Sequence, residues 1–342
     1  MMRLPPFRYL SPVSVSDAAK LMAEHGPTAM LVAGGTDLFP NMKRRQFEPT
    51  VLVGLRGLRE LVGVGAATGG GLRIGAGTAL TAVARHLDVA RAYPALATAA
   101  GVVSTPQLRN MGTVGGNVCV DTRCNYYNQS YQWRKAVNFC MKKDGEICLV
   151  APGSPRCWAV SSSDTAPVLW SLDATVRLVG PTGERTIPLA ALYRDDGIEY
   201  LAKRPDEVLT DIMLPPADGL RCVYLKLRRR GAFDFPVLGV AAALHMDGER
   251  VHAARIVLGA VASQPREAME AGTMLVGQRL SPELIAAVAD RASRPSKPLD
   301  NTDLTHPYRK KMTRVYVERA LRRLAGLDEG GRPDPFMEEA RA

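Results

Sequence analysis

The chain has 342 residues, of which 46% are hydrophobic and 23% charged. This length allows two or three domains with hydrophobic cores, and no apolar run approaches the ~20 residues of a membrane-spanning helix. Lys and Arg outnumber Asp and Glu by 44 to 34, which gives a net charge of +10. That excess is typical of a solvated basic face, a phosphate-bearing cofactor or an acidic protein partner. It is spread along the chain without a zinc-finger or RNA-binding motif, so we expect no nucleic-acid partner.

The first 100 residues alternate between helical and extended patterns. Ser14 or Ser16 caps a predicted helix that ends at Gly26-Pro27. Short buried strands are predicted over residues 29–35 and 50–55, and two more around the glycine turn of residues 63–77. Residues 81–100 have helical spacing that breaks at Pro94. The N-terminus lacks the pattern of a signal peptide, so we expect a cytoplasmic protein with no membrane association.

From residue 173 onward the sequence predicts strands and then helices. The strands cover residues 174–180, 185–189, 207–215 and 222–229. Residues 235–262 predict a hairpin with Asp247-Gly248 as its two-residue turn. One helix begins at Ser281-Pro282 and another covers residues 306–324. Residues 329–342 predict a flexible tail.

A segment at residues 122–160 differs from both of its neighbours. It is rich in Tyr, Asn, Cys and Lys and has little periodicity, so we predict an inserted loop. Around it we expect a first domain over residues 1–218, divided into subdomains 1–56 and 57–218, and a second domain over residues 219–328.

Two glycine-rich loops are candidates for binding a phosphate-bearing ligand, because bare glycine backbone can point successive N–H groups at an anion. The first loop and the strand before it comprise Leu31, Val32, Ala33, Gly34, Gly35, Thr36, Asp37 and Leu38. The second comprises Thr113, Val114, Gly115, Gly116 and Asn117. The first alone is equally typical of a plain strand-to-loop turn, but two glycine loops in one domain favour a large phosphate-bearing ligand. Neither matches G-x-G-x-x-G, so a Rossmann site is not indicated.

Four cysteines within the inserted segment are candidate metal ligands. Cys124, Cys140, Cys148 and Cys157 follow the spacing C-x15-C-x7-C-x8-C. This spacing leaves zinc, an iron–sulfur cluster and scattered buried thiols open. Cys119 and Cys222 lie in apolar surroundings and are expected in the core.

Nothing in the sequence indicates a catalytic centre. We find no nucleophile motif and no paired catalytic carboxylates, so we predict no catalytic residue in this chain. If the chain belongs to an enzyme, the bond-breaking step is expected on another subunit.

The order LVAGGTDL, TPQLRNMGTVGGN, SSDTAPVL and a strand bearing Lys226 resembles the flavoprotein subunits of the xanthine dehydrogenase family of molybdenum hydroxylases. The resemblance covers residue 7 to about residue 324. It implies an α+β fold, with a two-part FAD-binding domain of the vanillyl-alcohol-oxidase (PCMH) type. A C-terminal α/β domain of the CO dehydrogenase flavoprotein type would follow.

The resemblance also implies roles for individual residues. Residues 33–38 would bind the FAD pyrophosphate, and residues 113–117 with Asp121 would make the second phosphate and ribityl contact. Asp164, Leu209 and Lys226 match positions that approach the flavin. In the family the second glycine loop normally runs directly into the segment of Asp164, whereas here the four cysteines intervene.

The cysteine insertion resembles that of the flavoprotein subunits of 4-hydroxybenzoyl-CoA reductases, in which the loop holds a [4Fe–4S] cluster. The resemblance implies that Cys124, Cys140, Cys148 and Cys157 are the cluster ligands. Aldehyde oxidoreductase flavoprotein subunits can carry such a cluster with different cysteine spacing.

These resemblances together predict an electron-transfer subunit with FAD and a [4Fe–4S] cluster. Its partners would be a large subunit with the molybdenum cofactor and a small [2Fe–2S] subunit, in a dimer of heterotrimers with ferredoxin as electron donor. The complex would reduce 4-hydroxybenzoyl-CoA to benzoyl-CoA. One alternative is the same subunit in an oxidative enzyme that acts on an aldehyde or a heterocycle. Another is a stand-alone flavoprotein or a zinc-stabilised binding module.

Overall fold

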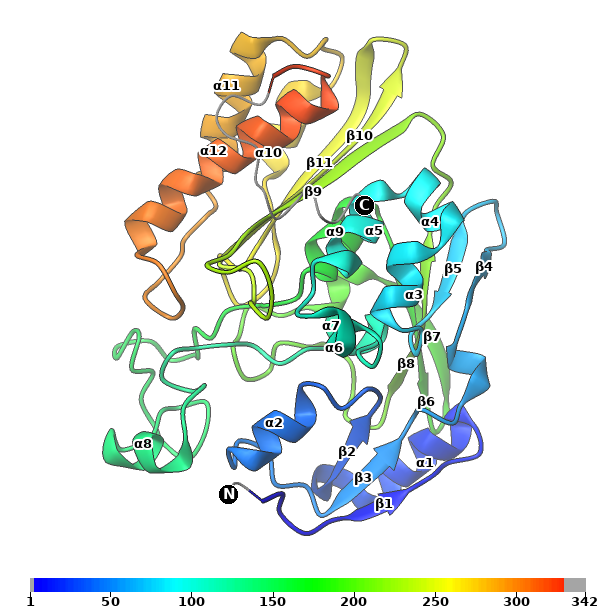
Figure 1. The fold of residues 1–342 in the computed structure, drawn as a ribbon, viewed down its shortest axis with the longest axis vertical. Coiled ribbons are helices and arrows are strands. Elements are labelled where there is room, and N and C mark those ends of the chain that lie inside the picture. Colours follow the sequence, from blue (N-terminus) through cyan, green and yellow to red (C-terminus); the bar gives the residue numbers. More distant parts are fainter. Residues whose placement is uncertain (1–2, 329–342) are drawn as a thin grey trace.

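The computed structural model describes residues 3–328, so the tail predicted at residues 329–342 lies outside the described residues. Figure 1 shows helices packed around three separate sheets. The first sheet is parallel in the order β1-β3-β2, with β1 (Arg8–Leu10), β2 (Ala29–Val32) and β3 (Val51–Gly54). Helices α1 (Val15–His25) and α2 (Leu38–Lys43) accompany it.

Alternating side chains of β3 explain why this small sheet carries a helix on each face. Val51 and Val53 join the apolar cluster of α1, whereas Leu52 between them packs with Met42 of α2. Successive side chains of a strand point to opposite faces, so the run of buried residues that predicted this strand serves two small cores. Ser14 caps α1 by accepting a hydrogen bond from the backbone N–H of Asp17, as predicted.

The second sheet is antiparallel in the order β4-β5-β8-β6-β7. Its strands are β4 (Val64–Ala66), β5 (Leu72–Gly75), β6 (Thr175–Gly180), β7 (Gly183–Pro188) and β8 (Val208–Leu214). The accompanying helices are α3 (Leu80–Arg85), α4 (Leu87–Ala92), α5 (Pro94–Gly101), α6 (Pro106–Arg109), α7 (Val114–Val118) and α9 (Thr165–Ser171). The helical stretch breaks before Pro94 as predicted, and it also breaks at His86, whose backbone is extended.

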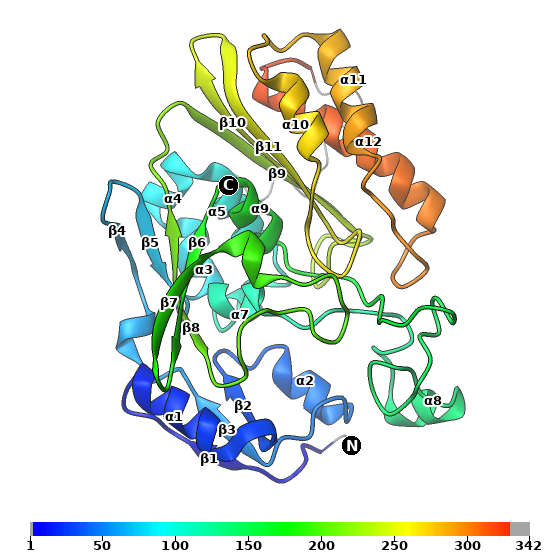
Figure 2. The same cartoon turned by 180° about the vertical axis from the view of Figure 1, so that it is seen from behind.

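The third sheet is antiparallel in the order β12-β11-β10-β9. It contains β9 (Leu220–Leu227), β10 (Leu238–Asp247), β11 (Arg250–Gly259) and β12 (Arg266–Glu267). Helices α10 (Met269–Leu275), α11 (Pro282–Ala292) and α12 (His306–Leu324) cover one face, and α5 and α9 pack against the other (Figures 1 and 2). One hydrophobic core therefore runs through the second and third sheets.

The hairpin of β10 and β11 corrects one detail of the sequence prediction. Asp247 pairs with Arg250, so the two turn residues are Gly248 and Glu249, one position later than predicted. Gly248 has a φ of +56°, which a glycine adopts without steric cost and which a two-residue hairpin turn requires at its first position.

Residues 122–160 form a lobe beside α2, visible in both views (Figures 1 and 2). A bridge between Arg123 and Val160 closes its neck. The predicted loop also contains a helix, α8 (Tyr131–Ala136), because Ser130 caps it by accepting a hydrogen bond from Trp133 N–H at 3.3 Å. The lobe has its own small apolar cluster, which is separate from the main core.

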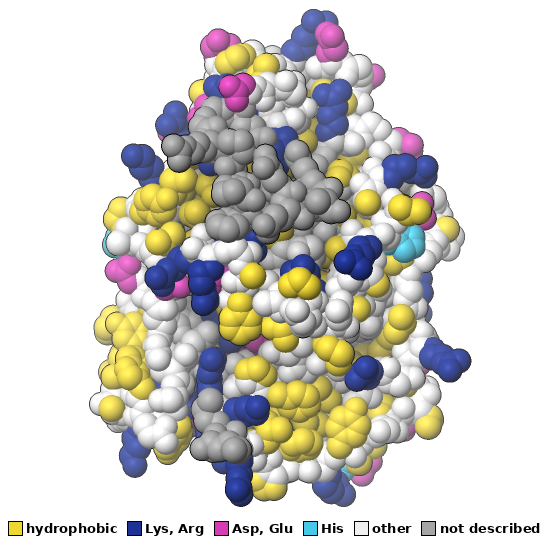
Figure 3. Space-filling view, in the orientation of Figure 1, with side chains coloured by type: hydrophobic (Ala, Val, Ile, Leu, Met, Phe, Trp, Pro, Cys, Tyr) yellow, Lys and Arg dark blue, Asp and Glu magenta, His cyan; other side chains and the backbone are white. Residues whose placement is uncertain are grey.

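Two surface properties bear on function. Within residues 3–328 no helix is both long and apolar enough to cross a membrane. Figure 3 shows Lys and Arg side chains dispersed over one face of the molecule, without a single dense basic patch.

Candidate functional site

The first glycine loop lies against the loop that precedes α7. The predicted segment 31–38 runs from the end of β2 through the loop into α2. A Cβ on Gly34 would lie 2.0 Å from the carbonyl oxygen of Met111, so only glycine lets the two backbones approach this closely. Gly35 has a φ of +70°, in the left-handed region that favours glycine. Residues 33–38 are partly exposed, as a ligand-binding loop requires.

The second predicted glycine turn folds as the short helix α7. Thr113 precedes it, and its Oγ1 accepts a hydrogen bond from Gly116 N–H at 3.0 Å. Asn117 Oδ1 accepts hydrogen bonds from Ser163 Oγ at 2.9 Å and from Thr165 Oγ1 at 2.7 Å. Thr113 and Asn117 therefore hold the backbone of this site in place, and their contact with a ligand stays a prediction.

Asp164 and Lys226 meet in a buried ion pair. Lys226 Nζ lies 2.8 Å from Asp164 Oδ2, and the Tyr224 hydroxyl donates to Asp164 Oδ1 at 2.8 Å. Lys226 Nζ also donates to the carbonyl oxygens of Val102 at 3.1 Å and Asp234 at 2.9 Å. Burial raises the pKa of Asp164 and lowers the pKa of Lys226, whereas their mutual attraction opposes both shifts. The pair joins the start of α9 to β9.

Leu209 lies in β8, where it pairs with Leu178 of β6 and is buried. Strand β8 packs against α7, and α7 packs against α9. The structure therefore brings the elements of Leu209, Asp164 and the second glycine loop together, although they are far apart in the sequence.

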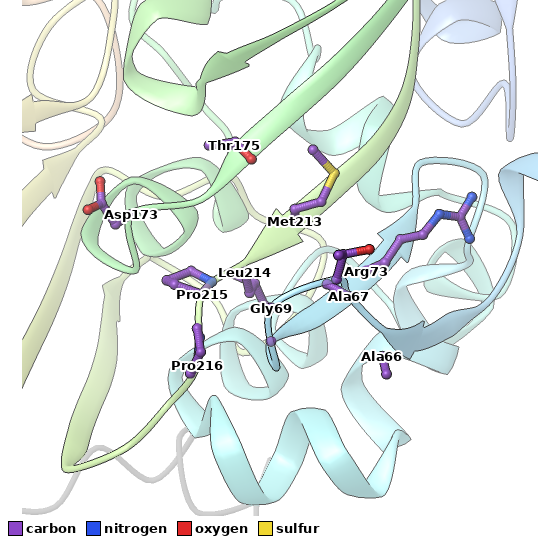
Figure 4. Close-up of a pocket in the computed structure, with 12 residues that line it drawn as sticks. Ala66, Ala67, Gly69, Arg73, Asp173, Thr175, Met213, Leu214, Pro215 and Pro216 are labelled. Carbon is purple, nitrogen blue, oxygen red and sulfur yellow. The ribbon is translucent and has the colours of Figure 1, made fainter.

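A groove elsewhere on the surface contains none of the predicted site residues. It lies between the β4–β5 turn and the end of β8, and its lining includes Gly69, Arg73, Met213 and Pro216 (Figure 4). The glycine loops and the inserted lobe therefore stay the predicted site.

The four predicted ligand cysteines line one cavity inside the lobe. Cys124, Cys140, Cys148 and Cys157 are each at most 8% exposed. Burial raises the pKa of Cys124 to about 12 and that of Cys157 to about 11, and Lys142 opposes the shift at Cys157. Within residues 3–328, no group of three or more His, Cys, Asp or Glu side chains is arranged around a position for a single metal ion.

Arg123, next to the first of these cysteines, attaches the lobe to the first glycine loop. Its guanidinium group bonds to the Asp37 carboxylate and donates to Asn41 Oδ1 at 3.3 Å. It also lies 4.5 Å from the ring centroid of Phe235, in the loop between β9 and β10. Burial lowers the pKa of Arg123 to about 10. One side chain thus connects the first glycine loop, the lobe and the second domain.

Two further basic side chains of the lobe contact residues outside it. Arg134 of α8 donates to the carbonyl oxygens of Arg44 at 2.9 Å and Arg45 at 3.0 Å, just beyond α2. Lys142 Nζ lies 2.8 Å from Asp121 Oδ1. Asp121, which we predicted as a cofactor contact, is therefore engaged in an ion pair with the lobe.

Three residues of this site were not predicted from the sequence: Arg123, Arg134 and Lys142. The available signal was their position inside the cysteine segment, since charged residues are rarely buried unless they are paired. Their partners lie 86, 90 and 21 residues away in the chain, respectively, so no local pattern indicates them.

These observations define a flavoprotein architecture: a two-part domain with adjoining glycine loops, followed by an antiparallel sheet covered by helices. Residues 5–217 match the family described as the FAD binding domain in molybdopterin dehydrogenase. Residues 223–324 match the CO dehydrogenase flavoprotein C-terminal domain.

The chain belongs to the FAD-binding medium subunits of the molybdenum hydroxylase family that includes xanthine dehydrogenase and CO dehydrogenase. The predicted α+β fold, with its FAD-binding and CO dehydrogenase flavoprotein-type domains, is confirmed.

Named relatives agree with this assignment. The chain is 36% identical over 263 residues to the aldehyde oxidoreductase FAD-binding subunit PaoB of Escherichia coli K12, an alignment that covers 74% of this chain and 81% of PaoB. It is 32% identical over 319 residues to the carbon monoxide dehydrogenase medium chain of Afipia carboxidovorans, covering 93% and 96% of the two chains. The solved structure of reconstituted CO dehydrogenase from Oligotropha carboxidovorans superposes with a TM-score of 0.79 at 28% identity, covering 96% of this chain and 100% of that chain.

Proposed function

We propose that this chain is an electron-transfer subunit of a molybdenum hydroxylase complex and that it carries both FAD and a [4Fe–4S] cluster. The [4Fe–4S] cluster is proposed because four spaced cysteines line one buried cavity. Four cysteine thiolates are the usual ligand set of such a cluster. When bound, the cluster supplies one-electron transfer and FAD supplies one- or two-electron transfer.

The residues of this chain fit both groups. Gly34 of the first loop packs against the backbone of Met111, which brings this loop next to α7. The lobe packs Cys124, Cys140 and Cys157 in an apolar cluster with Tyr127 and Ala159. Arg123 and Lys142 attach the lobe to the flavin domain. We infer that these contacts fix the cluster at a set distance from the flavin.

We propose an oxidative reaction for the complex. The relatives include an aldehyde oxidoreductase subunit and carbon monoxide dehydrogenase medium chains, which favours a complex that oxidises a small substrate. A large subunit would hold the molybdenum cofactor and a small subunit the [2Fe–2S] clusters, as a dimer of heterotrimers in the cytoplasm. This chain contributes no group to bond breaking in that proposal.

The cysteine lobe favours a second candidate, the reductive removal of the hydroxyl group of 4-hydroxybenzoyl-CoA. Its spacing of C-x15-C-x7-C-x8-C resembles the cluster insertion of 4-hydroxybenzoyl-CoA reductases. In that case a reduced ferredoxin would deliver electrons to this subunit.

The cofactor proposal is tested on the anaerobically purified complex. Beyond the iron of the [2Fe–2S] subunit, we expect about four irons per chain, with matching acid-labile sulfide and visible absorbance that dithionite bleaches. Cys140→Ser should lose these additional irons and keep those of the [2Fe–2S] subunit, whereas Cys222→Ser, a change at a buried cysteine in β9, should keep both. Zinc in place of iron, or full iron content in Cys140→Ser, would refute the cluster assignment.

The direction of the reaction is tested separately. Aldehydes with a dye as electron acceptor, and 4-hydroxybenzoyl-CoA with a low-potential one-electron donor, are compared on the same complex. Turnover with the first pair supports the oxidative proposal, and turnover with the second alone overturns it.

A further inference from the structure

Lys142 is a buried cation at the wall of the cysteine cavity. It lies between Cys140 and Cys148 in the sequence, and its side chain is only 6% exposed. It lines the same cavity as the four cysteines, whereas Asp121, its ion-pair partner, does not line that cavity. The cation of the pair therefore belongs to a residue of the cavity wall, whereas the anion does not.

The ammonium group of Lys142 is held in place by a full set of partners. Nζ donates to Asp121 Oδ1 and to Thr122 Oγ1, each at 2.8 Å, and to the carbonyl oxygen of Gly197. Three acceptors satisfy the three donors of a lysine ammonium. The rings of Tyr127 and Tyr200 lie with their centroids 4.8 Å and 5.6 Å from Nζ, so the charge cannot swing into solvent.

A fixed positive charge at this place would shift the reduction potential of a cluster in one direction. A cluster held by four thiolates is anionic and becomes more negative on reduction. Net charge and solvent exposure are among the properties that set cluster potentials, and a charge acts strongly in a buried, water-poor site. A cation at the cavity wall stabilises the reduced state more than the oxidised state.

We propose that Lys142 is a positioning residue that raises the reduction potential of the cluster and joins the cluster lobe to the flavin domain through Asp121. This inference rests on the proposed function, because it presupposes a cluster in the cavity. It goes beyond that function by assigning the potential to one side chain that is not a ligand.

The neighbouring Lys143 provides a matched control. It carries the same charge one residue further along, pairs with Asp144 at 3.1 Å, and does not line the cavity. Lys143→Gln therefore makes the same change of net charge outside the cavity wall.

The experiment is a redox titration of the purified complex followed by electron paramagnetic resonance. The ratio of reduced to oxidised cluster is measured at a fixed solution potential near the wild-type midpoint. We expect Lys142→Gln to lower this ratio by about tenfold, which corresponds to lowering the midpoint potential by ~59 mV for one electron. Lys142→Arg should restore most of the ratio, and Lys143→Gln should leave it within twofold of wild type. Asp121→Asn should raise it, because the cation is then no longer neutralised.

Each outcome decides the inference. An unchanged ratio in Lys142→Gln with full iron content would overturn it, and so would an equal shift in Lys143→Gln. If Lys142→Gln does not retain the cluster, Asp121→Asn decides, since a ratio that fails to rise overturns the inference. A wild-type complex without a [4Fe–4S] signal would instead overturn the proposed function.

Discussion

Replacing Gly34 by alanine tests whether the two adjoining loops form the flavin site. The new Cβ would lie 2.0 Å from the carbonyl oxygen of Met111, whereas real Cβ contacts are essentially never under 3.0 Å. The two backbones must therefore separate by about 1 Å. Overpacking of this kind costs about 1–3 kcal/mol, and if that cost falls on the FAD-binding arrangement, affinity drops about 5- to 150-fold.

The assay is titration of the flavin-free protein with FAD, followed by flavin fluorescence, together with thermal unfolding of the same samples. Gly57→Ala is the control, because a Cβ there would have no atom within 4 Å, and we expect wild-type affinity from it. A folded Gly34→Ala protein that binds FAD within twofold of wild type would refute the reasoning that the loops act as one site.

Three further predictions concern the buried charges and the flavin linkage. Lys226→Met leaves the Asp164 carboxyl buried without its cation. We expect the free energy of unfolding, measured in denaturant, to fall by about 3–5 kcal/mol, and a fall of less than about 1 kcal/mol would contradict this prediction. Hydrogen bonds from Arg185 lower the pKa of Glu207. Ionised Glu207 therefore stabilises the folded protein above the ordinary glutamate pKa, and this contribution is lost as the pH falls through the lowered pKa. Melting temperatures should therefore drop more steeply with acidification in wild type than in Glu207→Gln, and parallel curves would argue against the shift. Neither glycine loop contains a histidine that could form a flavin bond, so acid precipitation should release all the FAD, and yellow colour in the protein pellet would disprove non-covalent binding.

Local sequence patterns determined much of the secondary structure. Buried runs and glycine turns predicted β2, β3 and the β4–β5 pair, and Ser14, Ser281 and Pro94 marked helix boundaries. These predictions succeeded because a cap or a strand depends on a few adjacent residues. The hairpin turn was misplaced by one residue because its register depends on cross-strand pairing.

The sequence also grouped the four cysteines, since they occur within one aperiodic segment. Only the tertiary structure determined that they line one cavity and that the lobe is held by Arg123, Arg134 and Lys142. The close approach of Gly34 to Met111 and the pair of Asp164 with Lys226 were equally hidden. Each of these contacts joins residues that are distant in the chain, and burial makes the pairing of their polar groups obligatory. The path of the chain between the elements, which no local pattern records, decides which groups meet.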